Sequence, residues 1–225
     1  MLDVAVIADD LTGAADCGVA LSAAGLPTFV ALAEAAPPRA SQVVAFDTDS
    51  RAVPEREAVE RTRRATERAL AAGARAVYRK LDSTLRGHVG RELAAVVRAV
   101  GVVRGARPLC VLAPAFPATG RTTRGGRVLV RGVPLEETEV WRDARVAGPA
   151  EPAAMLGAAG LSAEVIPLDS VRGGPGVLRG ALLGAAALAD AVVCDAEVDA
   201  DLAAIATAAA GLDRPVAWAG SAGLA

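Results

Sequence analysis

The chain has 225 residues, of which 53% are hydrophobic and only 3% aromatic, with 24 basic and 26 acidic side chains. This length suffices for one large α/β domain or two small ones, with a core made mostly of Ala, Val and Leu. The formal charge of −2 gives no general attraction for nucleic acid or anionic lipid, and the aromatic residues are too few for base stacking. We therefore expect neither a nucleic-acid nor a membrane partner, and any anion-binding site must be local.

Cysteine and histidine usage narrows the class of protein further. The cysteines Cys17, Cys110 and Cys194 are far apart and lack CxxC spacing, which is typical of reduced thiols in a cytoplasmic protein. The opening MLDVAVIADDL has no basic region and soon meets acidic residues, so no signal peptide or transmembrane span is expected. A single histidine, His88, argues against a His-based zinc site.

Apolar β-type runs alternate with helical patterns from one end of the chain to the other. The predicted strands are Val4–Ala8, Thr28–Leu32, Val43–Phe46, Ala76–Tyr78, Leu109–Leu112, Glu164–Pro167, Ala191–Cys194 and Val216–Ala219. The predicted helices are Ala14–Ala24, Glu55–Ala72, Val89–Val100, Glu151–Ala159, Val177–Ala189 and Asp201–Ala210. This alternation is typical of an α/β fold with a mainly parallel sheet flanked by helices in three layers.

The helix predicted from Glu55 to Ala72 has the clearest local signals. Pro54 suits the first helical position, and Gly73 can end the helix. The arginines along it are typical of a solvated face rather than of a binding surface. Its i,i+4 pairs in the favourable order are Glu57/Arg61 and Glu60/Arg64.

The alternation breaks between Ala113 and Val140. Gly125-Gly126 precedes the apolar run Arg127–Val130, which predicts a small β-ribbon near residues 125–135 that projects from the edge of the sheet. The polar segment Asp143–Pro152, interrupted by Pro and Gly, is either a linker or a long loop within one domain.

Charged and hydroxyl side chains follow four of the predicted strands. They are Asp9 and Asp10; Asp47, Asp49, Ser50 and Arg51; Lys80, Asp82, Ser83, Thr84 and Arg86; and Arg121, Thr122, Thr123 and Arg124 within the loop Pro114–Arg124. Ligands of open parallel sheets bind outside the carboxyl ends of the strands, so these side chains are expected to meet at one edge. Single members, such as Asp10 or Thr12, are also good helix caps, but caps do not require lysine and arginine beside aspartate.

This mixture of groups favours a small polyhydroxylated anion as ligand. Arginine binds carboxylate or phosphate in a bidentate fork, and aspartate accepts hydrogen bonds from sugar hydroxyls. An aspartate that accepts a hydroxyl proton is also what phosphoryl transfer to an alcohol needs. No GxxxxGK[ST] or GxGxxG motif follows the first strand, so no nucleotide loop is predicted here.

Two further polar residues remain open. His88 lies at the predicted start of a helix, where a surface or capping role is expected, although it is close enough to line the site. Asp195 follows an apolar strand and is expected either to cap the helix that follows or to support the site as a secondary polar group.

Six segments, in this order, resemble the four-carbon acid sugar kinases: IADDLTGAADCGV, FDTDSR, YRKLDSTLRGHVGRE, APAFPATGRTTRGGRVLVRGVPLEETE, CDAEVDADL and WAGSAGLA. The resemblance covers essentially the whole chain. It implies phosphorylation of threonate, erythronate or 3-oxo-tetronate at the terminal hydroxyl, with ATP and Mg²⁺ as cofactors.

In that family an amino-terminal domain binds the sugar acid and a carboxy-terminal domain binds the nucleotide. The resemblance therefore implies that residues 1–225 are the sugar-acid-binding domain, and that a nucleotide-binding domain is supplied by the rest of a longer chain or by a separate chain. Because everything that holds ATP and most of the magnesium site would then be missing, the alternatives are a non-catalytic sugar-acid binding module and an inactive truncated kinase.

The family's substrate-site motifs map onto eight residues of this sequence. Asp9 or Asp10 would be the catalytic base, no metal ligand is assigned, and the substrate-binding residues would be Arg51, Lys80, Asp82, Ser83, Thr84 and Arg86. His88 stands where the family more often has asparagine, which implies an effect on substrate choice rather than on binding as such.

Overall fold

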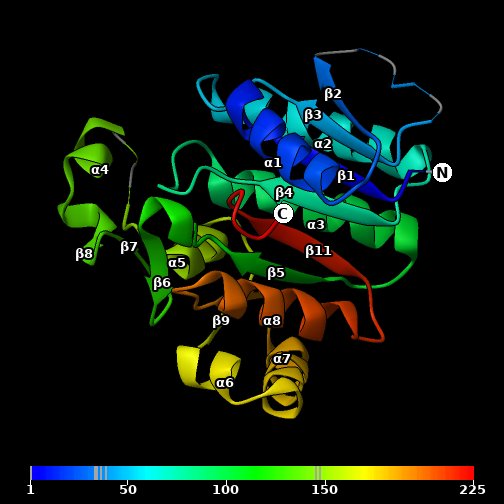
Figure 1. Ribbon diagram of the computed structural model, residues 1–225. Coiled ribbons are helices and arrows are strands. Elements are labelled where there is room, and N and C mark those ends of the chain that lie inside the picture. Colours follow the sequence, from blue (N-terminus) through cyan, green and yellow to red (C-terminus); the bar gives the residue numbers. More distant parts are fainter. Residues whose placement is uncertain (1, 33–34, 36, 39, 145, 147) are drawn as a thin grey trace.

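The computed structural model describes residues 2–225 except 33–34, 36, 39, 145 and 147. Its centre is an eight-stranded sheet in which every neighbouring pair is parallel (Figure 1). In sheet order the strands are β2 (Thr28–Leu32), β3 (Val43–Asp47), β1 (Val4–Ala8), β4 (Ala76–Lys80), β11 (Val216–Gly220), β5 (Leu109–Ala113), β10 (Ala191–Cys194) and β9 (Ala163–Ile166). The predicted parallel sheet is confirmed.

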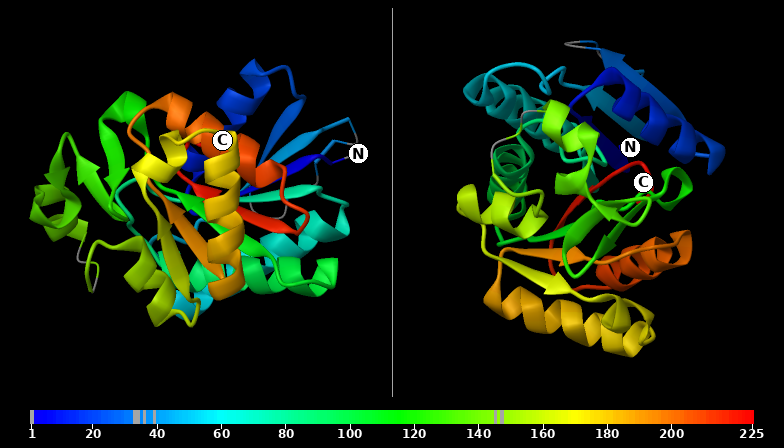
Figure 2. Two further views of the ribbon diagram at one scale, coloured as in Figure 1. Left: turned by 90° about the horizontal axis from the view of Figure 1, so that it is seen from below. Right: turned by 90° about the vertical axis from the view of Figure 1, so that its left-hand side faces the viewer.

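Helices cover both faces of this sheet, which confirms the three layers (Figure 2). One face carries α2 (Glu55–Ala71), α3 (Val89–Arg104) and α5 (Pro152–Ala158). The other face carries α1 (Leu11–Ala23), α6 (Leu168–Arg172), α7 (Pro175–Leu188) and α8 (Asp199–Ala210). None of the described helices is long and apolar enough to cross a membrane.

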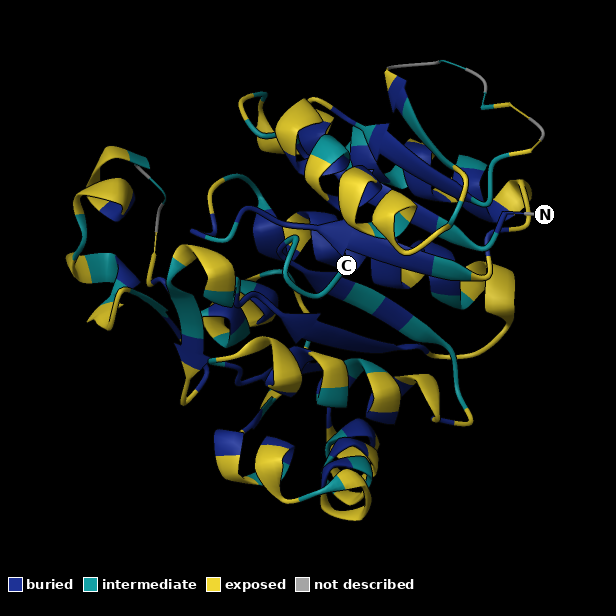
Figure 3. Ribbon diagram, in the orientation of Figure 1, coloured by how far each residue is buried: buried dark blue, intermediate teal, exposed yellow. Residues whose placement is uncertain are grey.

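The strands are apolar on both sides because both sides are covered. Along β1, Ala5 and Ile7 pack toward α2 and α3, whereas Val6 and Ala8 pack toward α1, as the two-residue period of a strand requires. All four residues are fully buried, and Figure 3 shows the buried sheet between helices whose outer faces are exposed.

Most predicted boundaries agree with the structure to within one or two residues; the exceptions are the start of α1 and the end of α3, which extends to Arg104 beyond the predicted Val100. Helix α1 begins at Leu11 rather than Ala14 because Asp10 caps it, its Oδ1 accepting from the Gly13 N–H at 2.8 Å. Pro54 is the N-cap of α2 and not its first helical residue, so that prediction was wrong by one position. Gly73 ends this helix region with a φ of +86°, a backbone region that favours glycine. Helix α6 was not predicted.

The predicted β-ribbon is a separate three-stranded antiparallel sheet made of β6 (Arg121–Arg124), β7 (Arg127–Val130) and β8 (Val133–Pro134). Helix α4 (Glu139–Ala144) follows it, and both project beyond the main sheet (Figure 1). The predicted linker, residues 143–152, lies between α4 and α5, and its residues 145 and 147 are outside the described part of the chain.

Asp195 anchors this ribbon to the main sheet. Its carboxylate accepts from the N–H groups of Gly125 at 2.7 Å and Gly126 at 2.9 Å, and Thr123 pairs with Ala196. The capping role considered for Asp195 was therefore wrong, because the turn amides of the ribbon take both carboxylate oxygens. It is Asp201 that accepts from the N–H groups at the start of α8.

A buried ion pair lies beneath the loops that follow β1, β3 and β4. Arg79 and Glu92 have side chains that are 0% and 2% exposed, with Arg79 Nη2 2.7 Å from Glu92 Oε2. Arg79 Nη1 donates to the carbonyl oxygens of Ile7 at 2.8 Å and Lys80 at 3.1 Å. Glu92 Oε1 accepts from Ser50 Oγ at 2.6 Å and Thr62 Oγ1 at 2.9 Å. One pair thus ties three strand ends to α2 and α3.

The substitution Glu92→Gln should destabilise the fold strongly, because it leaves the Arg79 charge buried without its counter-ion. We expect a loss of about 3–5 kcal/mol in the free energy of unfolding, measured by urea denaturation. The matched control is Glu55→Gln, whose partner Arg91 lies 3.6 Å away with both side chains more than half exposed; it should change little. Equal effects of the two substitutions would contradict the role given to the buried pair.

Candidate functional site

Five neighbouring strands, β3, β1, β4, β11 and β5, direct their carboxyl ends to one edge of the sheet, where α/β proteins bind ligands. A cavity of about 250 Å³ lies there, smaller than the roughly 300–1,000 Å³ of pockets for drug-sized ligands. It is lined by Asp10, Thr12, Gly13, Asp16, Arg51, Lys80, Asp82, Ser83, Arg86, Phe116, Thr119, Arg121, Ser221 and Ala222.

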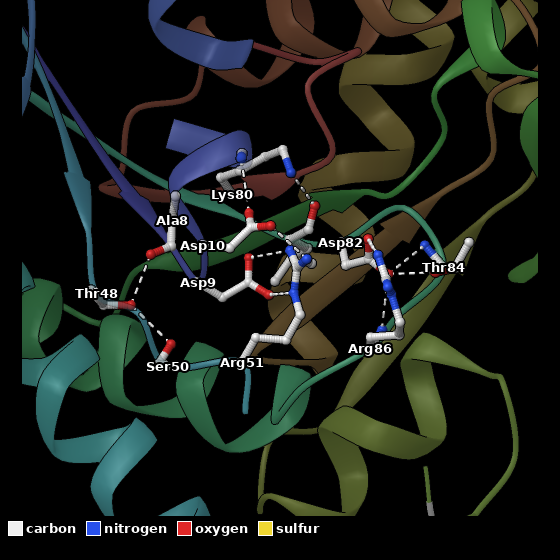
Figure 4. Close-up of polar contacts among 12 residues, drawn as sticks. Ala8, Asp9, Asp10, Thr48, Ser50, Arg51, Lys80, Asp82, Thr84 and Arg86 are labelled. Carbon is white, nitrogen blue, oxygen red and sulfur yellow. Dashed lines mark hydrogen bonds and ion pairs between the residues drawn. The ribbon is translucent and has the colours of Figure 1, made fainter. Parts of the chain in front are cut away.

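Two aspartates at the end of β1 hold Arg51, which follows β3 (Figure 4). Asp9 accepts from Nε at 2.6 Å and from Nη2 at 3.0 Å in a bidentate pair, and Asp10 Oδ2 accepts from Nη1 at 2.6 Å. Burial opposes the positive charge of Arg51, but hydrogen bonding and attraction to Asp9 outweigh it and raise the pKa of Arg51 further. This arginine is already neutralised by the protein.

The two aspartates differ in their access to the cavity. The Asp9 side chain is 3% exposed and does not line the cavity, whereas that of Asp10 is 28% exposed and does. Asp10 is fixed from two sides, by Arg51 and by the first turn of α1 through Gly13. Asp9 therefore orients Arg51, and Asp10 is the one carboxylate of the pair that a ligand in the cavity can reach.

Lys80 extends from the end of β4 into the same space. Its residue is 6% exposed, and Nζ donates to the carbonyl oxygen of Leu81 at 2.8 Å. Within the described part of the chain, no carboxylate forms an ion pair with this ammonium group. A buried cation without a counter-ion is costly, so Lys80 marks a place where an anionic ligand would be favoured.

The loop after β4 is organised by Asp82. Its carboxylate accepts from Arg86 Nε at 2.8 Å, Arg86 Nη2 at 2.9 Å and the hydroxyl of Thr84 (Figure 4). Burial raises the pKa of Asp82, but the hydrogen bonds from Arg86 and Thr84 outweigh burial and leave the pKa well below its usual value. The tight turn places Leu85 at a φ of +56° and Gly87 at +87°. Asp82 is thus ionised and committed to shaping the loop.

The structure brings all eight of the predicted site residues to this edge of the sheet, and six of them line the cavity. Asp9 and Thr84 lie behind it as partners of Arg51 and Asp82. The lining residues that the sequence did not assign to a site are Thr12, Gly13, Asp16, Phe116, Thr119, Arg121, Ser221 and Ala222. Arg121 carried a signal, because it belongs to the charged loop after the fifth strand, and Ser221 lies in the segment WAGSAGLA, which resembled the family without being assigned to the site.

Ser221 reaches the cavity because β11 lies between β4 and β5. Its backbone oxygen accepts from the Tyr78 hydroxyl, and its own Oγ donates to the carbonyl oxygen of Ala115 at 2.5 Å. Ser221 is 1% exposed, so this turn joins the ends of β4, β11 and β5 into one wall.

His88 occupies the N-cap position of α3 without a capping hydrogen bond from its side chain. Its Nε2 lies 2.8 Å from the carbonyl oxygen of Val53, and it borders a second cavity of about 440 Å³ that Arg51 also lines. The expected surface or capping role is replaced by a contact between two loops next to the site.

Metal-binding capacity is not apparent in the described residues. They contain no group of three or more His, Cys, Asp or Glu side chains that could hold a metal ion.

The sequence profile of the sugar-binding N-terminal domain family matches residues 4–225. The chain belongs to this family. Among curated relatives, it is 47% identical over 225 residues to the D-threonate kinase of Cupriavidus necator, covering 98% of this chain and 52% of that protein. It is 40% identical over 147 residues to the D-erythronate kinase of Heliobacterium modesticaldum, covering 64% of this chain and 33% of that protein. This sugar-binding domain thus spans about half or less of the length of these relatives.

Solved structures share the fold of this sugar-binding domain. A protein of Salmonella typhimurium described as a putative tRNA synthase has a TM-score of 0.88 at 26% identity, covering 100% of this chain and 55% of that one. A domain of unknown function from Bordetella bronchiseptica, a domain-swapped dimer with bound citrate, has a TM-score of 0.80 at 33% identity, covering 99% and 54%.

Because Gly13 has no side chain, the side chains of Asp10 and Lys80 can both lie close to its Cα. A substitution tests how much this space matters. A Cβ at position 13 would lie 2.8 Å from Asp10 Oδ1 and 2.9 Å from Lys80 Nζ. In Gly13→Ala, the gain of about 1 kcal/mol from helix propensity should be cancelled by loss of the Asp10 cap, also about 1 kcal/mol. The control Gly180→Ala in α7, where a Cβ meets open space, should show the full gain in urea denaturation. Equal stabilisation of both variants would show that Asp10 and Lys80 move aside without cost.

Proposed function

We propose that this chain is the substrate-binding half of an ATP-dependent kinase that phosphorylates a four-carbon acid sugar at its terminal hydroxyl. The observation that carries the proposal is the cavity that brings the fixed carboxylate of Asp10 near the buried ammonium group of Lys80, which forms no ion pair with any residue that the structure describes. A hydroxy acid offers both complementary groups, because its hydroxyls donate to a carboxylate and its carboxylate pairs with a cation.

The relatives support this choice of substrate class. They are named D-threonate, D-erythronate and 3-oxo-tetronate kinases, and the related Bordetella structure holds citrate, which is itself a hydroxy acid. The size of the cavity is consistent with a ligand of this kind.

In this proposal Asp10 is the base that accepts the proton of the terminal hydroxyl. Asp9 is less suitable because its side chain is 3% exposed and does not line the cavity. Arg51 holds Asp10 in place, while Lys80, Ser83 and Arg86 bind the substrate, and Asp82 with Thr84 shapes the loop that carries them. A base held within reach of the hydroxyl contributes a factor of about 10²–10⁴ to the rate.

ATP and Mg²⁺ are assigned mainly to a nucleotide-binding domain that is not among these 225 residues. The described residues form neither a metal cluster nor a glycine-rich nucleotide motif. We assign the protein to the cytoplasm, which the three buried free cysteines support. The competing function is a sugar-acid binding module without catalysis, which the same cavity would serve equally well.

Ligand-induced stabilisation tests the substrate class. Thermal unfolding of the chain should be measured separately with D- and L-threonate, D- and L-erythronate, 3-oxo-tetronates and Mg-ATP. At about 100 times its dissociation constant, a ligand stabilises the fold by roughly 2.7 kcal/mol, or about 5–10 °C for a chain of this size. We expect a shift with at least one sugar acid and none with Mg-ATP; no shift with any acid would refute the proposal.

The base assignment is tested by Asp10→Asn in the chain supplied with its nucleotide-binding domain. Turnover should fall by about 10²–10⁴-fold, while affinity for the sugar acid changes much less. Asp49→Asn is the control, because the Asp49 side chain is 88% exposed and does not line the cavity. Full turnover in Asp10→Asn would remove the base assignment, and absence of turnover in the wild type with any phosphoryl donor would favour the binding module.

A further inference from the structure

Arg121 is the cavity-lining arginine whose charge the protein does not balance. Arg51 is paired with Asp9 and Asp10, and Arg86 is paired with Asp82. The Arg121 side chain has neither a hydrogen bond nor an ion pair to any residue that the structure describes, and its Nε is buried without a partner. Leaving a buried donor of a charged group unsatisfied costs free energy unless something else supplies the acceptor.

The backbone of Arg121 is nevertheless held firmly. It pairs with Phe116 through two hydrogen bonds, from the Phe116 N–H to the Arg121 carbonyl at 2.8 Å and from the Arg121 N–H to the Phe116 carbonyl at 3.2 Å. The preceding turn closes with Gly120 at a φ of +73°, and β6 pairs with β7 from Arg121 onward. The guanidinium group is therefore presented to the cavity from a rigid base rather than from a free loop.

Its position along the sheet edge is opposite to that of Asp10. Asp10 follows β1 and Arg121 is tied to the end of β5, with β4 and β11 between them. Three strand spacings of about 4.8 Å separate β1 from β5 by about 14 Å. Since Asp10 and Arg121 both line the cavity from these different strands, a small ligand can meet Asp10 with its hydroxyl end and Arg121 with its other end.

We propose that Arg121, together with Lys80, binds the carboxylate of the sugar acid and so selects acids over neutral polyols. This inference rests on the proposed function and adds the residue that reads the anionic end of the substrate. The planar guanidinium fork matches a carboxylate in a bidentate pair, and the ligand carboxylate supplies the acceptor that Nε and its neighbours lack. The three-stranded ribbon, anchored by Asp195, is then the part of the fold that holds this specificity element in place.

The test compares Arg121→Gln, Arg121→Lys and wild type by calorimetric titration with D-threonate, D-erythronate and the corresponding tetritols, threitol and erythritol. Arg121→Gln should weaken binding of the preferred acid about 10- to 100-fold, as expected for a hydrogen-bonded charge pair, and leave tetritol binding unchanged. Arg121→Lys should fall between wild type and Arg121→Gln. Without ligand, Arg121→Gln should melt no lower than wild type, because no hydrogen bond or ion pair to a described residue is lost.

Arg124→Gln is the matched control. It lies on the same strand but on the opposite face, pairs with Glu197 at 3.0 Å and is 67% exposed; its acid affinity should equal that of the wild type. Equal loss of acid and tetritol binding in Arg121→Gln, or no loss of either, would overturn the inference while leaving the proposed function intact. Failure of wild type to bind any acid would overturn both.

A third ligand distinguishes binding of the carboxylate by Arg121 from binding of a phosphoryl group. The sugar acid phosphorylated at its terminal hydroxyl carries both a carboxylate and a phosphate. If Arg121 binds the carboxylate, Arg121→Gln weakens the phosphorylated and unphosphorylated acids by the same factor. A larger factor for the phosphorylated acid would assign Arg121 to the phosphoryl group and overturn the carboxylate assignment.

Discussion

The positions of the cavity residues depend on one buried ion pair, Arg79–Glu92. Arg79 directly precedes Lys80 at the end of β4. Its side chain donates to the carbonyl oxygen of Ile7, two residues before Asp9. Glu92 accepts from Ser50, which directly precedes Arg51. Burying two charges is expensive, and such pairs are rarely the most stable solution. What this pair supplies is position, since it fixes the loops after three strands to the same two helices.

Above this pair, the site is assembled from charges that the protein has already balanced. Arg51 and Arg86 each have carboxylate partners within the chain, so their charge is partly balanced before any ligand binds. Lys80 and Arg121 lack such partners among the described residues, and both line one small cavity. Counting arginines in the sequence overstates how much positive charge a ligand meets, because ion pairing within the site decides which cations remain available.

Local patterns predicted the layers and the strand ends, because hydrophobic periodicity and capping are properties of short segments. For Asp9 and Arg51, such reasoning predicted only that they lie at the same edge of the sheet. That they pair with one another depends on β1 and β3 being neighbours. Asp195 was misjudged because its partners, the amides of Gly125 and Gly126, lie about 70 positions earlier. Ser221 was missed because nothing in its surroundings reveals that its strand lies in the middle of the sheet.

That central placement of β11 has a consequence for synthesis of the protein. Strand β11 is the last element in the chain, yet it lies between β4 and β5 and pairs with both. Until residues 216–220 leave the ribosome, β4 and β5 are unpaired apolar edges of two separate partial sheets. Long-range pairing of this kind folds slowly and leaves such edges open to association with other chains. The two partial sheets therefore stay open to such association until β11 pairs with both of them.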